Sequence, residues 1–399
     1  MPLLRGRIAK DARASLADLS AHALRLRLSD LPDPSLAGGL AGIALVHAAL
    51  DRAFPEAGHR DRAQRALHRA TDRLAREPIR PGLYAGLAGI GWVMEHLAER
   101  DAEGDEDACA AVDTALVRHV DHHPWSDPFD LVEGLVGIGV YALERLPRPS
   151  AKRLLRAVVG HLSEMAVRRA PGVAWRAEPN RVFDLGVAHG AAGVIALLGR
   201  IIDADVDART KKSARALLEK AVAWLLAQEL PRGSDGCFAM AVARGIPRKA
   251  ARLAWCYGDP GIAATLLMAA RAAREPAWER AAVRVGLRAA ARPEASSGVR
   301  DAGLCHGAAG VAHVFHRLYR TTREERFADA SRLWFARALA MRTPGRGVAG
   351  FRAWAPDAKG KLGWRTDAGF LMGAAGITLA LLAATGDTEC AWNRVLLLP

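Results

Sequence analysis

The sequence is poor in the residues that mark several large classes of protein. Aromatic residues make up only 6% of its 399 positions. Alanine, leucine and arginine dominate instead, and this mixture favours helices because alanine and straight-chain residues lose little freedom in them. Only five cysteines are present, at positions 109, 237, 256, 305 and 390. Such a long chain with so few cysteines is not a disulfide-stabilised secreted domain, so we expect reduced thiols, metal ligands or buried apolar residues.

Long apolar runs are also lacking. The N-terminus, MPLLRGRIAKDARASL, has charge but no apolar run of signal-peptide length. The longest apolar stretches elsewhere stop short of a bilayer span. We therefore predict a cytoplasmic protein with no transmembrane segment.

The formal net charge is +13, carried mostly by arginines scattered along the chain. Scattered arginines indicate solvated surface residues, and the alternative is a face that steers acidic partners. No zinc-finger spacing, RNP motif or basic heptad region is present, so nucleic acid is not an expected partner.

A short glycine signature, G-x-x-G followed by Ile or Val, occurs seven times. Successive copies lie from about 47 to about 70 residues apart, a period that suits two helices and their loops. The copies begin at Gly39, Gly86, Gly134, Gly190, Gly258, Gly307 and Gly373. An Ala/Leu-rich run follows each copy and a charged amphipathic run precedes it, which indicates alternating inner and outer helices.

The repeats predict an all-α fold, an α/α toroid of seven helical hairpins in one domain spanning residues 1–399. Closure into a ring is favoured over an open solenoid because the seventh copy, AGFLMGAAGITLALLAATG, is as apolar as the middle ones and would pack against the first repeat. Segments 168–184, 229–250 and 343–365 are rich in Gly, Pro, Trp and Arg, and we expect loops there that cap one end of the ring.

Aligning the signatures compares positions that should be structurally equivalent. Cys256 and Cys305 both lie two residues before the first glycine of their copies, and His306 follows Cys305 directly. The residue just before the first glycine varies most, and includes His189 and Tyr257. Since these positions lie at the starts of neighbouring inner helices, we expect these five side chains to form one cluster.

Two thiolates and one imidazole are a set typical of catalytic zinc, with a fourth position left for substrate. The alternatives are a structural zinc with His189 as fourth ligand, two buried thiols, or a disulfide between Cys256 and Cys305. With a neutral histidine, this ligand set balances the charge of Zn²⁺. Such a site favours activation of a further thiol over activation of water.

Four segments resemble the lanthionine synthetase C-like cyclases. They are RLAWCYGDPG, GLCHGAAG, the HGAAG of the fourth repeat and the closing AWNRVLLLP. The resemblance covers nearly the whole chain and implies an α/α toroid with one zinc ion. It also implies a reaction in which the zinc binds a precursor-peptide cysteine as thiolate. That thiolate adds to dehydroalanine or dehydrobutyrine and leaves a (methyl)lanthionine thioether ring.

The resemblance also implies roles for individual residues. Cys256, Cys305 and His306 match the zinc ligands, and His189 in VAHGAAG matches the acid/base of the family. Three further matches are Asp130 in FDLVEG, Arg252 in RLAWC, where it would stabilise the enolate, and Tyr257 in WCYG.

Each further match has a plainer alternative. Asp130 could simply cap an inner helix, or it could orient His189. Arg252 could be a solvated surface residue and Tyr257 a packing residue. Glu133, at the repeat position of His189, could be a helix-start charge.

The partners implied by the resemblance are a dehydrated precursor peptide with its leader and a separate dehydratase. A transporter is a further candidate, and peripheral association with a membrane in a biosynthetic complex is the alternative location. Competing functions are the addition of glutathione to dehydrated residues in proteins and a non-catalytic peptide-binding scaffold. A toroidal glycosidase would need paired carboxylates, for which the repeat alignment offers only Asp130 and Glu133.

Overall fold

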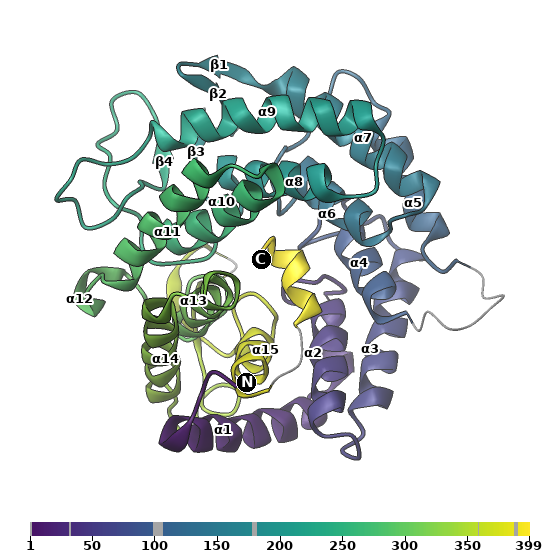
Figure 1. Cartoon of the computed structure of the whole chain (residues 1–399). Coiled ribbons are helices and arrows are strands. Elements are labelled where there is room, and N and C mark those ends of the chain that lie inside the picture. The colour runs from purple at the N-terminus through teal and green to yellow at the C-terminus, as the bar shows by residue number, and fades with distance from the viewer. Residues whose placement is uncertain (1, 32, 99–106, 178–181, 358, 387–389) are drawn as a thin grey trace. The chain divides into compact units, whose positions relative to one another are not determined.

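The computed structural model describes residues 2–31, 33–98, 107–177, 182–357, 359–386 and 390–399 (Figure 1). Residues group into two compact units. The first unit comprises Met1–Pro78, Leu253–Trp255 and Pro293–Ala391, and the second comprises Ile79–Arg252, Cys256–Arg292 and Trp392–Pro399. The single domain expected over residues 1–399 stays a prediction.

Helices dominate both units. The first unit contains the helices α1 (Gly6–Arg25), η1 (Leu28–Asp30), α2 (Leu40–Ala53), α3 (His59–Leu74), α12 (Glu294–Ser297), α13 (Ala308–Thr322), α14 (Glu325–Ala340) and α15 (Ala374–Thr385), with strands β5 (Ala353–Pro356) and β6 (Leu362–Arg365). The second unit contains α4 (Leu87–Leu97), α5 (Ala110–Val120), α6 (Leu135–Glu144), α7 (Pro149–Met165), α8 (Ala191–Asp203), α9 (Ala208–Leu226), α10 (Asp259–Ala273) and α11 (Pro276–Ala290), with strands β1 (Val167–Arg169), β2 (Gly172–Ala174), β3 (Phe183–Asp184) and β4 (Ala241–Val242). The short helix η2 spans Ala391–Leu396.

A helix starts directly after the first glycine of every signature, as the repeat predicts. We call these the signature helices: α2, α4, α6, α8, α10, α13 and α15. The first signature shows why glycine is needed. A Cβ on Gly39 would lie 2.1 Å from the carbonyl oxygen of Asp33, because the preceding loop folds back onto the helix start. The same oxygen accepts a hydrogen bond from the backbone N–H of Leu40.

Each signature helix packs against an amphipathic helix of its own unit. In the second unit α7 lies along α6, α9 along α8 and α11 along α10 (Figure 1). In the first unit α15, the last signature helix, contacts α1, α2 and α13. This contact confirms that the seventh copy is buried against the first repeat.

The three segments expected as loops also contain short antiparallel strands, so the expectation of loops alone was wrong there. β1 pairs with β2, β3 with β4 and β5 with β6. Strands of two to four residues are too short to show an alternating hydrophobic pattern, which explains why the sequence did not reveal them. The β3–β4 pair joins residues 183–184 to residues 241–242.

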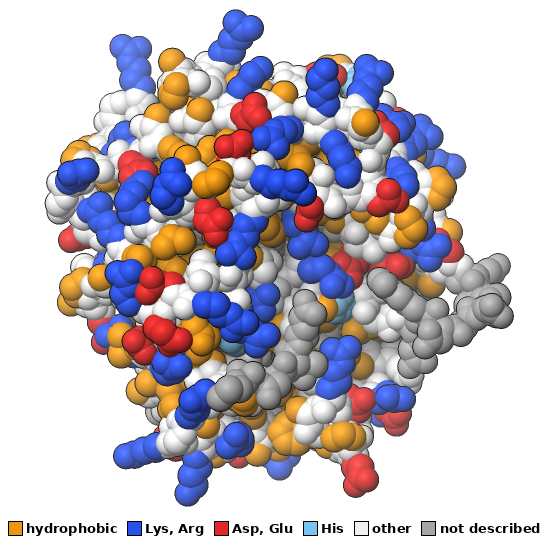
Figure 2. All heavy atoms as spheres, viewed as in Figure 1, with side chains coloured by type: hydrophobic (Ala, Val, Ile, Leu, Met, Phe, Trp, Pro, Cys, Tyr) orange, Lys and Arg blue, Asp and Glu red, His pale blue; other side chains and the backbone are white. Residues whose placement is uncertain are grey.

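The molecular surface carries its positive charge in dispersed form. On the face drawn in Figure 2, Lys and Arg side chains are spread over many elements and interspersed with Asp and Glu. Among the helices of the described residues, none combines the length and the hydrophobicity that a bilayer span requires.

Candidate functional site

Backbone hydrogen bonds connect the loops that precede successive signature helices. In each of the links described below, the acceptor is the carbonyl of the residue two before the first glycine, the position that Cys256 and Cys305 occupy. In the second unit the links are Tyr84 N–H to Val132 O (3.1 Å), Leu131 N–H to Ala188 O (3.1 Å) and Val187 N–H to Cys256 O (2.8 Å). In the first unit they are Trp255 N–H to Cys305 O (3.1 Å), Cys305 N–H to Leu371 O (2.8 Å) and Leu371 N–H to Ala37 O (3.0 Å). We call this set of bonds the loop belt.

Cys305 and His306 end the loop before α13 in the first unit. Both are half-buried. The loop belt holds the backbone of Cys305 on both sides, through its N–H and through its carbonyl. The buried carboxylate of Asp301 fixes the rest of the loop, since it accepts hydrogen bonds from the backbone N–H groups of Gly303 (3.0 Å) and Trp354 (2.7 Å).

Cys256 and Tyr257 end the loop before α10 in the second unit. Cys256 is 4% exposed, and its carbonyl accepts hydrogen bonds from Val187 (2.8 Å) and Ala188 (3.2 Å). The ring of Tyr257 stacks on that of His189, with centroids 6.0 Å apart. Gly186 lets the backbone before α8 lie close to Cys256, because a Cβ on Gly186 would lie 2.3 Å from the carbonyl oxygen of Cys256.

His189 and Asp130 form a close pair within the second unit. Nδ1 of His189 lies 2.6 Å from Oδ2 of Asp130, and the side chains are 37% and 13% exposed. The other oxygen of Asp130 accepts hydrogen bonds from the backbone N–H groups of Val132 (3.0 Å) and Glu133 (2.8 Å). Asp130 therefore caps the loop before α6 and contacts His189 at the same time. It does not cap α6 itself, whose N-cap is Gly134 with no side-chain hydrogen bond. A role in orienting His189 stays a prediction.

The charges around His189 favour its protonated form. Burial acts to lower the pKa of His189, but the hydrogen bond and charge of Asp130, together with the charge of Asp184, outweigh burial and raise that pKa above its usual value. His189 therefore holds a proton to higher pH than an exposed histidine would.

Asp184 is a nearby acid that the sequence reasoning missed. Burial is the main cause that raises the pKa of Asp184 to about 6, and the charge of Asp130 adds to it, while His189 acts in the opposite direction. The repeat alignment contained a signal for Asp184. This residue lies six positions before the first glycine of the fourth copy, and Asp301 lies at the same position in the sixth copy.

Two other residues considered from sequence lie at the surface. Arg252 is exposed, four residues before Cys256. Glu133 is exposed as well, next to the helix start of α6, which agrees with a helix-start charge. Their positions leave the enolate role of Arg252 a prediction.

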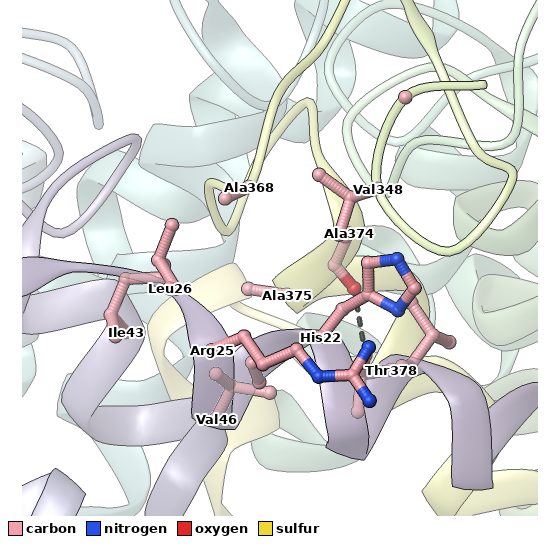
Figure 3. Close-up of a pocket in the computed structure, with 13 residues that line it drawn as sticks. His22, Arg25, Leu26, Ile43, Val46, Val348, Ala368, Ala374, Ala375 and Thr378 are labelled. Atoms are coloured by element: carbon pink, nitrogen blue, oxygen red, sulfur yellow. Dashed lines mark hydrogen bonds between the residues drawn. The ribbon is translucent and has the colours of Figure 1, made fainter. Parts of the chain in front are cut away.

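A cavity of about 190 Å³ in the first unit differs in character from these loops (Figure 3). Its lining comes from α1, α2, α15 and nearby loops and is mainly aliphatic, as with Ile43 and Val46. His22 and Arg25 of α1 are its titratable members, and the described lining contains no thiol or carboxylate. The cavity therefore lacks the groups that thiol chemistry needs.

Comparison with known proteins agrees with this arrangement. A family model described as lanthionine synthetase C-like protein matches residues 31–397. Among solved structures, nisin cyclase is similar at a TM-score of 0.73 and 19% sequence identity, over 98% of this chain and 98% of that chain. This shared fold confirms the predicted α/α class.

Proposed function

The chain belongs to the lanthionine synthetase C-like family, and on this premise we propose that it is a zinc-dependent lanthipeptide cyclase. Its substrate is a precursor peptide in which a separate dehydratase has already formed dehydroalanine or dehydrobutyrine. The reaction joins a peptide cysteine to the alkene and leaves a (methyl)lanthionine ring. The reaction takes place in the cytoplasm, and a transporter that exports the product is a further proposed partner.

The residues present suit one zinc ion per chain. We propose that Cys256, Cys305 and His306 hold this ion. Two thiolates and an imidazole are a known catalytic set for zinc. The loop belt supports their convergence. Trp255 donates its backbone N–H to the carbonyl of Cys305, and Cys256 is the next residue after Trp255 in the chain.

When bound there, zinc supplies a Lewis acid that favours the thiolate form of a substrate cysteine. The site residues then need only to position the peptide and move protons. The substrate sulfur forms a bond to the β-carbon of the dehydro residue, and the alkene electrons move onto the adjacent carbonyl as an enolate. The α-carbon takes a proton to complete the thioether.

His189 is the residue best placed to deliver that proton. Its Nδ1 is engaged by Asp130, so Nε2 is the ring nitrogen that exchanges a proton with substrate. The hydrogen bond and charge of Asp130 raise the pKa of His189 above its usual value against the effect of burial, so His189 holds a proton to higher pH than an exposed histidine, which suits a general acid. Asp130 fixes the ring, Tyr257 stacks on it, and Arg252 is proposed to stabilise the enolate from the exposed end of its loop.

A single observation carries this proposal. Cys256 and Cys305 occupy equivalent loop positions in adjacent repeats, and His306 directly follows Cys305. The loop belt joins Cys256, through the N–H of Val187, to the loop of an acid–base pair, His189 and Asp130. A peptide-binding scaffold would not need this combination.

The test is to incubate purified protein with dehydrated precursor and to follow free thiols by alkylation and mass spectrometry. We expect thiols to disappear without a change in precursor mass. A gain of one glutathione in mass, in a parallel reaction with that thiol, would favour the glutathione-adding alternative. Cys305→Ala should abolish both zinc binding and thiol loss.

Cys390→Ala is the matched control, because it removes a half-buried thiol outside the proposed site. It should retain zinc and activity. Circular dichroism should show native helix content in both variants. Full activity of a zinc-free Cys305→Ala protein would overturn the proposal.

A further inference from the structure

A second group of metal-ligating side chains lies within the second unit. His123 belongs to the segment between α5 and α6, and His161 and Glu164 belong to α7. One ligand atom from each residue lies within 4.8 Å of the others. None of these residues takes part in the proposed cyclase chemistry, so the group needs its own explanation.

His161 is prepared to act as a ligand. Its side chain is 1% exposed, and Nε2 lies 2.7 Å from the carbonyl oxygen of Val120. A carbonyl can only accept, so Nε2 carries the hydrogen and the lone pair of the neutral ring is on Nδ1. That buried Nδ1 has no hydrogen-bond partner among the described residues. Metal-bound histidines commonly donate their other N–H to a carbonyl in this way.

The spacing of the three ligand atoms suits a first-row metal ion. Oε2 of Glu164 lies 3.6 Å from Nδ1 of His161 and 3.8 Å from Nδ1 of His123. Metal–ligand bonds of about 2.1 Å at tetrahedral angles separate ligand atoms by about 3.4 Å. The ligand atoms of the two histidines lie within 4.8 Å of each other, so the exposed His123 and Glu164 side chains would move inward to bind one ion together with His161.

A plain ion pair explains less of this geometry. His123 and Glu164 are each 60% exposed, where an ion pair contributes little to stability. An ion pair also leaves the buried Nδ1 of His161 outside hydrogen-bond range at 3.6 Å, and an unsatisfied buried polar atom destabilises the folded protein. A cation among the three atoms would satisfy all of them.

From ligand atoms that lie within 4.8 Å of one another, we propose that His123, His161 and Glu164 bind a divalent transition-metal ion of the zinc class, independently of the ion proposed at the cysteines. Two imidazoles and one carboxylate suit zinc, cobalt and nickel, and the exposed side leaves room for water as a further ligand. The ion fastens residues 121–128 to α7. That segment leads directly into Phe129 and Asp130, so the ion also steadies the loop that holds His189.

The experiment uses untagged, full-length Cys305→Ala protein, in which the cysteine centre is disabled. Dialysis against zinc followed by metal analysis should give one equivalent per chain. Cobalt should give visible d–d bands without the near-ultraviolet sulfur-to-cobalt absorption that a thiolate site shows. This spectrum distinguishes the second site from any residual binding at Cys256.

Adding His123→Ala or Glu164→Gln to this background should remove that equivalent, and because both side chains are exposed, neither change threatens the fold. Adding His122→Ala instead, a change at the neighbouring exposed histidine, should leave the bound equivalent of metal in place. The proposal is overturned if the Cys305→Ala protein binds no metal, or if its His123→Ala derivative binds metal equally well. Neither result bears on thiol loss by the wild-type protein, which tests the cyclase proposal independently.

Discussion

Replacing Asp130 by Asn separates the two roles of this carboxylate. The Asn carbonyl oxygen can still accept hydrogen bonds from the backbone N–H groups of Val132 and Glu133, as Oδ1 of Asp130 does. The amide NH₂ then faces Nδ1 of His189 and can only donate to it. The variant should therefore keep its fold while His189 loses both a negative neighbour and the acceptor of its Nδ1 proton.

The size of the effect follows from the pair's surroundings. A hydrogen bond to a charged group contributes about 1.5–3 kcal/mol. Because the His189 side chain is 37% exposed, solvent screens the pair and the lower part of that range applies. A loss of about 1.5–2 kcal/mol corresponds to a rate of thioether formation lower by about 10- to 30-fold.

The pH dependence gives the second readout. Asp130 raises the pKa of His189 in the native protein, so its removal lowers that pKa. If protonated His189 is the acid, the rate falls as pH rises through this pKa. The alkaline limb of the rate profile should therefore move to lower pH in Asp130→Asn, and rates should be measured by thiol alkylation across the pH range with saturating dehydrated precursor.

Asp130→Ala provides the comparison, because it also removes the cap and should lower the unfolding temperature as well as the rate. A native rate and an unchanged pH profile for Asp130→Asn would refute the role given to this pair. An Asn variant that is as unstable as the Ala variant would show that its cap does not survive the substitution.

Three further predictions concern stability and the metal. Although burial opposes it, hydrogen bonds from a neighbouring histidine and from Arg394 hold the pKa of Glu144 at about 2. The stability that this provides is fully present above the pKa of Glu144 in the unfolded chain, about 4.5, and is lost as pH falls from there towards 2. Arg394→Met should therefore cost about 2 kcal/mol in urea unfolding at pH 7 and less at pH 3, and an equal cost at both would contradict this. Gly310→Ala places a Cβ 1.7 Å from the carbonyl oxygen of Leu304 and should destabilise by about 3 kcal/mol, whereas Gly160→Ala, with open space around it, should not. Removal of zinc by a chelator should abolish thiol loss and leave the circular dichroism spectrum unchanged, and a collapse of helix content would indicate a structural metal.

Much of the helical fold could be predicted because its signal repeats. Gly39 and the six glycines equivalent to it mark every signature helix start. At all of them except Gly258, the preceding loop is shown to leave no room for a side chain. The strand pairs could not be predicted in the same way. The paired residues of β3 and β4 lie 57 and 59 positions apart in sequence and each strand contains two residues, so neither local pattern nor propensity identifies their pairing.

The candidate site was predictable to the extent that it lies on the repeat. The alignment pointed to His189, and the family resemblance to Asp130, and the structure places the two side chains in contact. The raised pKa of Asp184 could not be read from the sequence, because it depends on burial and on a charge from another repeat. The tautomer of His161 depends likewise on a tertiary contact with Val120.

The double attachment of Cys305 bears on when the protein can acquire its ion. Its backbone N–H and carbonyl are both engaged by neighbouring loops, so the backbone of this proposed ligand is held in place without the ion. If zinc binds there as proposed, chains synthesised during zinc scarcity would accumulate as intact but inactive molecules. Resupply of the ion would then restore activity at the speed of diffusion and ligand exchange, with no need for new synthesis or chaperone-assisted refolding.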